Sequence, residues 1–135
     1  MIPSVYKEVN KMENFAECST IVTQELTAQA MGSGSLAVFA TPALAALMEK
    51  AACLVMDGGL EEGIASVGVE MSLEHLAASP VGMEVRATAR LLESDGRRFT
   101  FEIEAHDKQG LVGRARHTRA TVKAEKFMER TQGRL

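Results

Sequence analysis

The segment from Phe39 to Met56, FATPALAALMEKAACLVM, constrains the fold of this chain more than any other. Most of its residues favour helix, Pro42 suits the first helical position, and Thr41 can cap the helix start. Gly58-Gly59 can end the helix by supplying a left-handed residue. At about 100° per residue, one wide arc of the helix is apolar and contains Leu44, Leu47, Met48, Ala51, Ala52, Val55 and Met56. A helix with so wide an apolar face must be covered by other structure.

Glu49 is the residue of this helix that most needs an explanation. It falls at the margin of the apolar arc, beside Ala45, Ala52 and Met56. Because other structure covers this face, we expect the carboxylate to be shielded from bulk water. Two interpretations stay open: a functional carboxylate, or a carboxylate paired with a lysine or arginine across an interface.

The rest of the chain alternates with a period of two, which indicates β-strands. The alternation is cleanest where Phe99, Phe101 and Ile103 share one face. A glycine-containing connection, MGSGS, precedes the helix, and residues 1–14 are polar enough to predict a loose N-terminal arm. The expected strands cover residues 16–27, 65–75, 83–93, 98–106 and 111–123.

The order of these elements predicts the fold class. One strand, the apolar helix and four further strands follow one another, and tight reversals at residues 78–80, 95–96 and 108–110 favour antiparallel neighbours. An antiparallel sheet of about five strands wrapped around one apolar helix is an α+β hotdog fold, here a single domain over residues 1–135. One such unit leaves an edge strand uncovered, so we expect a homodimer or a higher homo-oligomer.

Composition excludes several classes of function. The chain is 46% apolar and 24% charged with a net charge of −3, which argues against a nucleic-acid or membrane partner. Cys18 and Cys53 lack C-x-x-C spacing and are expected to be free thiols in a reducing compartment. No signal peptide or membrane span is evident, so we expect a cytoplasmic protein. The three histidines are too scattered for a zinc motif, and no metal site is predicted.

Three polar residues have positions that suit chemistry: Thr41, Glu49 and His75. Eight residues of helix separate Thr41 from Glu49, a rise of about 12 Å. A pocket that joins them must therefore lie along the helix or take one of them from a partner subunit. The simpler alternatives are that Thr41 only caps the helix and that His75 only ends a strand, with its ring bonded to backbone. His106 and His117 are expected at the surface or at an interface.

A shielded carboxylate and a histidine are suited to acyl transfer if they converge on a carbonyl. Histidine titrates near neutral pH, and loss of solvent raises the pKa of a glutamate, so the two can manage protons during the reaction. A glutamate and a histidine 26 residues apart are common, so this pattern alone does not specify a function.

Longer motifs carry a resemblance to a known family. The segments VFATPALAALMEKAA and VGVEMSLEHLAASPVGMEV are followed by GRRFTFEIEAHD, GRARHTRATV and EKF. Together, from Leu36 to Phe127, they resemble the fluoroacetyl-CoA thioesterase-like family of hotdog proteins.

The resemblance implies an acyl-CoA thioesterase in which Thr41, Glu49 and His75 form the catalytic group. Glu49 would attack the thioester carbonyl to give an acyl-enzyme that water then hydrolyses, while Thr41 and His75 assist proton transfer and thiol release. It also implies that Gly68 and Arg119 contact the substrate. No cofactor is expected beyond the CoA thioester that serves as substrate.

Two features qualify this resemblance. The segment before the helix, MGSGSLAVF, is shorter than the aromatic lid of the fluoroacetyl-specific member, and Phe39 is its one aromatic residue and a candidate substrate contact. This predicts a substrate other than fluoroacetyl-CoA. Strand alternation places Gly68 and His75 on opposite faces, so a shared pocket requires a bulge or a subunit boundary. A non-catalytic acyl-CoA-binding or sensing domain, and a hotdog hydratase or dehydratase, remain the alternative functions.

Overall fold

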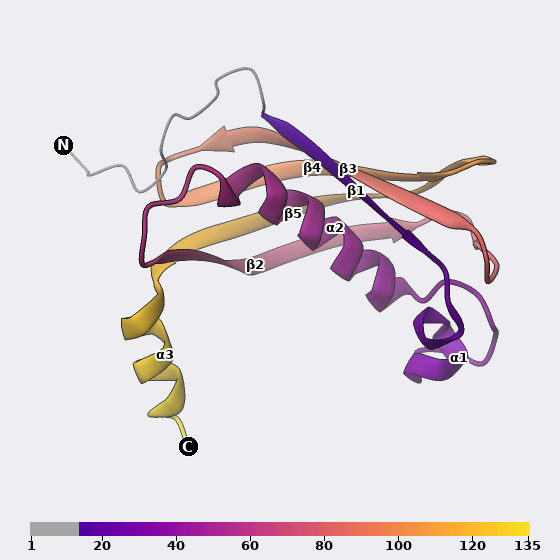
Figure 1. The fold of residues 1–135 in the computed structure, drawn as a ribbon, viewed down its shortest axis with the longest axis horizontal. Coiled ribbons are helices and arrows are strands. Elements are labelled where there is room, and N and C mark those ends of the chain that lie inside the picture. Colours follow the sequence, from indigo (N-terminus) through magenta and orange to yellow (C-terminus); the bar gives the residue numbers. More distant parts are fainter. Residues whose placement is uncertain (1–13) are drawn as a thin grey trace.

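The computed structural model describes residues 14–135, so the predicted N-terminal arm lies almost entirely outside the described residues. A five-stranded antiparallel sheet curves around one long helix, α2 (Figure 1). This confirms the predicted α+β hotdog fold. The elements are β1 (Phe15–Ile21), a 3₁₀ turn (Gln24–Leu26), α1 (Ala28–Met31), α2 (Thr41–Asp57), β2 (Ile64–His75), β3 (Glu84–Ser94), β4 (Arg98–Asp107), β5 (Gly110–Lys123) and α3 (Ala124–Gln132).

The strands lie in the order β1-β3-β4-β5-β2, which makes β2 an edge strand. The hairpins that join β3 to β4 and β4 to β5 turn at Gly96 and Gly110, whose φ angles are 89° and 135°. The predicted reversal between β2 and β3 is wrong, because β2 pairs with β5 instead. The segment that follows β2 must cross to β3, which is not a neighbour of β2 in the sheet. On the way, Pro80 forms an isolated β-bridge with Val38, and the Ser79 hydroxyl donates a hydrogen bond to Asp107.

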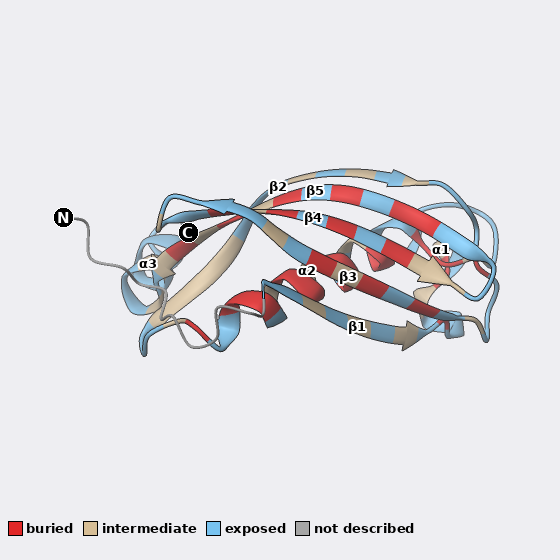
Figure 2. Cartoon of the chain, turned by 90° about the horizontal axis from the view of Figure 1, so that it is seen from above, coloured by how far each residue is buried: buried red, intermediate tan, exposed pale blue. Residues whose placement is uncertain are grey.

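Helix α2 forms the core together with the inward faces of β3 and β4. The side chains of Leu44, Met48 and Met56 are completely buried, and burial of each such side chain contributes about 1.5–3 kcal/mol relative to exposure. Figure 2 shows buried and exposed residues alternating along the strands that cover the helix. The predicted apolar arc is confirmed: the buried helix residues are Ala43, Leu44, Leu47, Met48, Ala51, Ala52, Val55 and Met56.

The ends of the predicted elements differ from the structure in three places. The N-cap of α2 is Ala40, so Thr41 is already helical and its hydroxyl makes no cap. Gly58 ends the helix with a φ of −69°, which is not left-handed. The first strand ends at Ile21 rather than near residue 27, because the chain turns there into the 3₁₀ turn and α1. Backbone bonds from Phe39 to Ser79 and from Ala40 to Leu26 fix the entry to α2, which leaves the Thr41 hydroxyl available for another partner.

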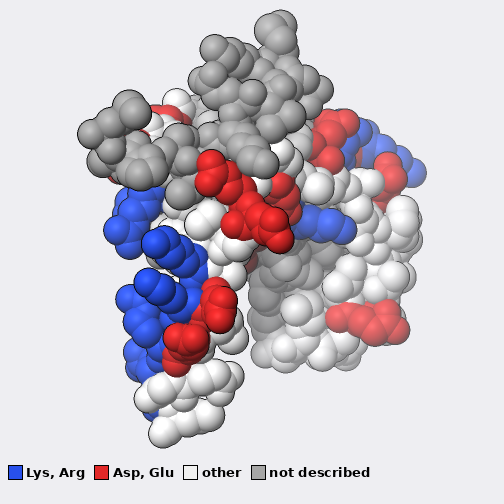
Figure 3. All heavy atoms as spheres, turned by 60° about the vertical axis from the view of Figure 1, so that its left-hand side comes forward, with Lys and Arg blue, Asp and Glu red and all other residues white. Residues whose placement is uncertain are grey.

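The C-terminal helix α3 leaves the sheet at the end of β5 and extends past the edge strand β2 (Figure 1). None of its residues, all of which the structure describes, is buried. Lysine and arginine side chains gather along one side of this protruding helix (Figure 3). Among the described residues, no helix is both long and apolar enough to cross a membrane.

Candidate active site

Thr41 and His75 form a hydrogen-bonded pair at the start of α2. The Thr41 Oγ1 atom lies 2.8 Å from His75 Nδ1. Both side chains line a pocket of about 250 Å³, and Phe39, which is only 1% exposed, forms part of its wall. The other ring nitrogen, His75 Nε2, is buried and makes no hydrogen bond to any residue between 14 and 135. Nε2 is therefore the nitrogen of the ring that is left without a partner among the described residues.

Burial sets the protonation state of His75. Loss of solvent lowers the pKa of His75 below its ordinary value, and the nearby Ala77 backbone opposes this shift only in part. The ring is therefore neutral at physiological pH. If Nδ1–H donates to the Thr41 hydroxyl, the lone pair of Nε2 is ready to accept a proton.

Glu49 lies in a second cluster, further along α2, with residues from β2 and β5. Its Oε2 atom accepts a hydrogen bond of 3.1 Å from Arg119 Nη1 and lies 3.7 Å from His117 Nε2. Glu49 is thus paired with an arginine, which was the alternative interpretation of this carboxylate, but the pair lies within one chain and not across an interface. The side chain is 44% exposed, so the single chain does not shield it as fully as expected. Its Oε1 atom makes no hydrogen bond or ion pair to any described residue.

Arg119 is held firmly by β2. Its Nε donates to Ser66 Oγ at 2.9 Å, and its Nη2 donates to the Ser66 carbonyl at 3.1 Å. The guanidinium is 8% exposed, and an arginine is always charged. The resemblance implies that Arg119 contacts the substrate, and within the chain Arg119 contacts the Glu49 carboxylate.

His117 was expected at the surface or at an interface, but it is buried within the chain itself and is only 1% exposed. Its Nδ1 lies 2.7 Å from the Glu70 carbonyl, and its Nε2 lies 3.2 Å from Arg119 Nη1. Burial lowers the pKa of His117, and the nearby Arg119 charge acts in the same direction. A signal for this position was available, because strand alternation puts His117 on the same face as Arg119. The density of charged residues along β5 concealed it.

A β-bulge resolves the predicted conflict between Gly68 and His75. The pairing of β2 with β5 shifts between Gly68 and Glu70, so Val69 is an extra residue in β2. Before the bulge, Ser66 and Gly68 face Arg119 and Glu49. After the bulge the parity is reversed and His75 faces Thr41. Both residues therefore lie on the helix side of the sheet.

The structure thus brings the predicted residues together in two groups. Thr41 and His75 form one group with Phe39 beside them, and Glu49, Gly68 and Arg119 form the other. Within the described part of the chain, no hydrogen bond or ion pair joins the two groups. This agrees with the separation of Thr41 and Glu49 along the helix.

Gly68 leaves space that a side chain would take from Glu49. A Cβ atom there would lie 2.5 Å from Glu49 Oε2 and 3.1 Å from His117 Cε1. The family resemblance makes Glu49 a catalytic group. On that expectation, Gly68→Ala displaces its carboxylate and lowers kcat for acyl-CoA hydrolysis by about ten- to a hundredfold, because small misplacements of catalytic groups are costly. Gly58→Ala is the matched control, since its Cβ would meet nothing within 4 Å. Equal kcat values for the two variants would contradict this placement.

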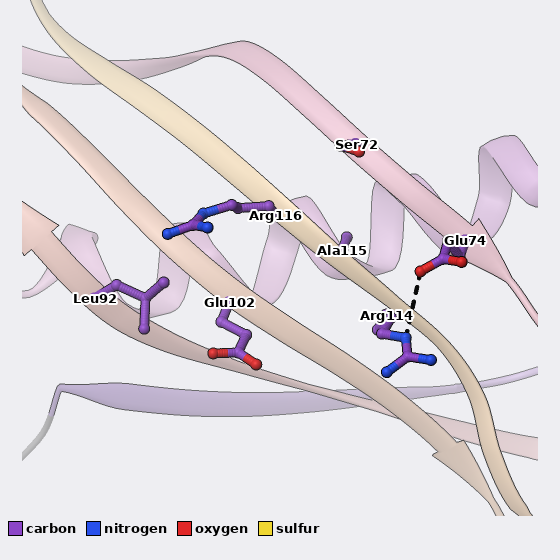
Figure 4. A pocket seen from close by; sticks show the side chains of 7 residues that line it. All are labelled: Ser72, Glu74, Leu92, Glu102, Arg114, Ala115 and Arg116. Carbon is purple, nitrogen blue, oxygen red and sulfur yellow. Dashed lines mark ion pairs between the residues drawn. The ribbon is translucent and has the colours of Figure 1, made fainter.

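Two other features do not belong to this site. A pocket of about 310 Å³ lies on the face of the sheet away from α2, among charged side chains such as Glu74 and Arg114, which pair at 3.4 Å (Figure 4). Cys18 and Cys53 are free thiols, as predicted, and partial burial raises the pKa of each. A raised pKa disfavours the reactive thiolate, so neither is an activated nucleophile.

A five-stranded antiparallel sheet wrapped around one long helix places the chain in the class of hotdog-fold proteins. The chain is similar to a Thermus thermophilus member of the thioesterase superfamily, with 29% identity, a TM-score of 0.81 and coverage of 99% of this chain and 96% of that one. A family model described as fluoroacetyl-CoA-specific thioesterase matches residues 22–125. The chain belongs to this family.

Individual members of the family support the same assignment. The fluoroacetyl-CoA thioesterase of Streptantibioticus cattleyicolor is 40% identical over 90 residues, which are 67% of this chain and 65% of that protein. The match therefore spans slightly less than two thirds of that curated relative. A mutant of the fluoroacetyl-CoA-specific thioesterase FlK, solved with fluoroacetate and CoA, is 32% identical, with a TM-score of 0.80 and coverage of 84% of this chain and 95% of that one.

Proposed function

We propose that this protein hydrolyses an acyl-CoA thioester to the free acid and CoA, with Thr41, Glu49 and His75 as the catalytic group. The observation that carries the proposal is the Glu49 carboxylate. One of its oxygens is held by Arg119, the other makes no bond to the described residues, and Gly68 leaves space beside it. Membership of a thioesterase family supports the same activity.

The proposed reaction has two steps. The Oε1 atom of Glu49 attacks the thioester carbonyl, the carbon–sulfur bond breaks, and the thiolate of CoA departs from a mixed anhydride on Glu49. Water then attacks the anhydride while His75 Nε2 accepts one of its protons, which releases the acid and restores the carboxylate. The proton passes from His75 to the thiolate, so the overall reaction consumes one water molecule. Thr41 fixes the orientation of the imidazole ring throughout.

We propose that the complete site forms between two subunits of a homodimer. Gly68, which lies against Glu49, and His75 are seven residues apart on β2, a distance of about 23 Å along a strand. No strand of the described residues pairs with the outer edge of β2, and Val69 on that strand is 44% exposed. Antiparallel pairing of β2 with its symmetry mate, centred near Met71 and Ser72, would place Gly68 of one subunit opposite the histidine of the other. Glu49 would then meet a partner's Thr41–His75 pair.

We propose that the preferred acyl group is not fluoroacetyl. From the segment MGSGSLAVF that precedes α2, Ser33, Val38 and Phe39 line the pocket beside Thr41, and among residues 14–135 no other phenylalanine or tyrosine side chain lines it. Such a short cover is unsuited to enclosing a two-carbon acyl group.

A thiol-release assay over a panel of acyl-CoA esters, from fluoroacetyl- and acetyl-CoA to longer chains, tests the proposed function. We expect saturable release of CoA, with a higher kcat/KM for at least one longer acyl group than for fluoroacetyl-CoA. Tight binding of CoA esters without thiol release would indicate a binding or sensing domain instead. Conversion of an enoyl or hydroxyacyl ester without free CoA would indicate a hydratase or dehydratase. A clear preference for fluoroacetyl-CoA would contradict the proposed specificity but not the proposed thioesterase activity.

A further inference from the structure

His117 is a buried titratable residue to which the reaction above assigns no role. It lies on β5 with its ring 6.4 Å from the ring of Phe101 on β4. Its polar neighbours come from three directions: the Glu70 carbonyl on β2, the Arg119 guanidinium on its own strand, and the Glu49 carboxylate on α2. Each ring nitrogen therefore has a polar partner: Nδ1 contacts the Glu70 carbonyl, and Nε2 contacts Arg119.

The partners of His117 determine which nitrogen carries the proton. A carbonyl oxygen can only accept, so Nδ1, at 2.7 Å from the Glu70 carbonyl, must donate. Arg119 Nη1, at 3.2 Å from Nε2, can only donate, so Nε2 must accept. These two contacts select the neutral Nδ1–H tautomer. A proton on Nε2 would direct one N–H group against another.

The same contacts link His117 to the Glu49 carboxylate. Arg119 Nη1 contacts both His117 Nε2, at 3.2 Å, and Glu49 Oε2, at 3.1 Å, and these two atoms are 3.7 Å apart. Ser66 holds the other end of the guanidinium, through Nε and Nη2. The acceptor on His117 therefore adds a third contact to the guanidinium, at the nitrogen that also contacts Glu49.

The Nδ1–H group of His117 contacts a different feature, the β-bulge in β2. Glu70 is the first residue of β2 that is paired again after the extra residue Val69. A bond to its carbonyl holds the strand at the point where the parity changes. One ring thus contacts both the bulge that puts Gly68 and His75 on the same face and the arginine that holds Glu49.

We infer that His117 is a positioning residue, which in its neutral Nδ1–H form orients Arg119, and through it the Glu49 carboxylate, for attack on the substrate. The kinetic part of this inference rests on the proposed thioesterase activity. The tautomer and the contact with Arg119 do not.

Two substitutions separate the two contacts. Asparagine places an amide near the position of Nδ1 and can keep the donor to Glu70, but it does not reach Arg119. Glutamine extends further and can present a carbonyl oxygen near the position of Nε2, which keeps the acceptor. We expect His117→Gln to retain kcat to within a few-fold, and His117→Asn to lower kcat by about ten- to a hundredfold with a smaller change in KM. If His117 only stabilises the bulge through its bond to Glu70, kcat should instead fall more in His117→Gln than in His117→Asn.

Nitrogen-15 NMR of the wild-type protein provides a test that needs no activity. The His117 ring should carry its proton on Nδ1 alone at neutral pH, and the Arg119 N–H signals should change in His117→Asn more than in His117→Gln. A proton on Nε2, or equal effects of the two variants on Arg119, would overturn the inference even if the protein is an active thioesterase. If the wild type hydrolyses no acyl-CoA ester, the proposed function fails, and the NMR result alone decides the role of His117.

Discussion

Replacing Glu49 with glutamine is expected to lower kcat for acyl-CoA hydrolysis by at least about 10³-fold, which is typical for loss of a catalytic nucleophile. The amide keeps the shape of the side chain and an oxygen that can accept from Arg119, at 3.1 Å in the wild type. It cannot, however, attack a thioester and regenerate a carboxylate. The measurement is the rate of thiol release with saturating substrate.

Glu74→Gln is the matched control for this variant. Glu74 lies on β2, its side chain is 66% exposed, and it pairs with Arg114 on the outer face of the sheet. Surface ion pairs of this kind contribute little, so the control should keep wild-type activity. Retention of activity by Glu49→Gln, with a melting temperature equal to that of the wild type, would remove Glu49 from the mechanism.

Replacing His75 with alanine is expected to lower kcat by about 10²- to 10³-fold, which is the usual contribution of a general base. Thr41→Val, which removes the hydroxyl 2.8 Å from Nδ1, should cause a smaller loss of about tenfold, because the ring stays but is less well oriented. His106→Ala is the control, since His106 lies on β4 with an exposed side chain near Glu104. Equal activities of the His75 and His106 variants would exclude the proposed base.

The pH profile gives an independent check on His75. Burial lowers its pKa, so the active neutral form persists to more acidic pH than an ordinary histidine would allow. The acid limb of kcat/KM should therefore lie below about pH 6.5, the value for an unperturbed histidine. In His75→Ala that limb should move, because the acid limb that remains would report His117, whose neutral form the positioning role also requires. An acid limb above this pH, unchanged in the variant, would indicate another group.

Much of the fold could be predicted from periodicity, because a helix or strand with one apolar face must bury that face. The arc on α2 and the alternation of Phe99, Phe101 and Ile103 both required burial, and the structure confirms both. The pairing of β2 with β5 rather than β3 could not be predicted, because strand periodicity fixes a face but not a neighbour. The cap of α2 was also mispredicted, since backbone bonds around Phe39 and Ala40 decide where the helix begins.

The candidate site was predictable only in part. The placement of Glu49 on the helix margin came from periodicity, whereas the roles of Thr41 and His75 came from the family resemblance. His117 was misplaced because the many charged residues along β5 concealed the alternation that puts it on the same face as Arg119. The bulge at Val69 could be stated only as one of two ways to reconcile Gly68 with His75, and the structure shows that it is present.

Subunit mixing shows whether Glu49 of one subunit and the Thr41–His75 pair of another subunit act on the same thioester. Glu49→Gln and His75→Ala chains, each nearly inactive alone, are refolded together in equal amounts. In a random mixture half of the dimers are hetero-dimers, and each carries one intact site of two, so we expect recovery of about a quarter of wild-type activity. A mixture no more active than the separate variants, with hetero-dimers shown to form, would contradict it.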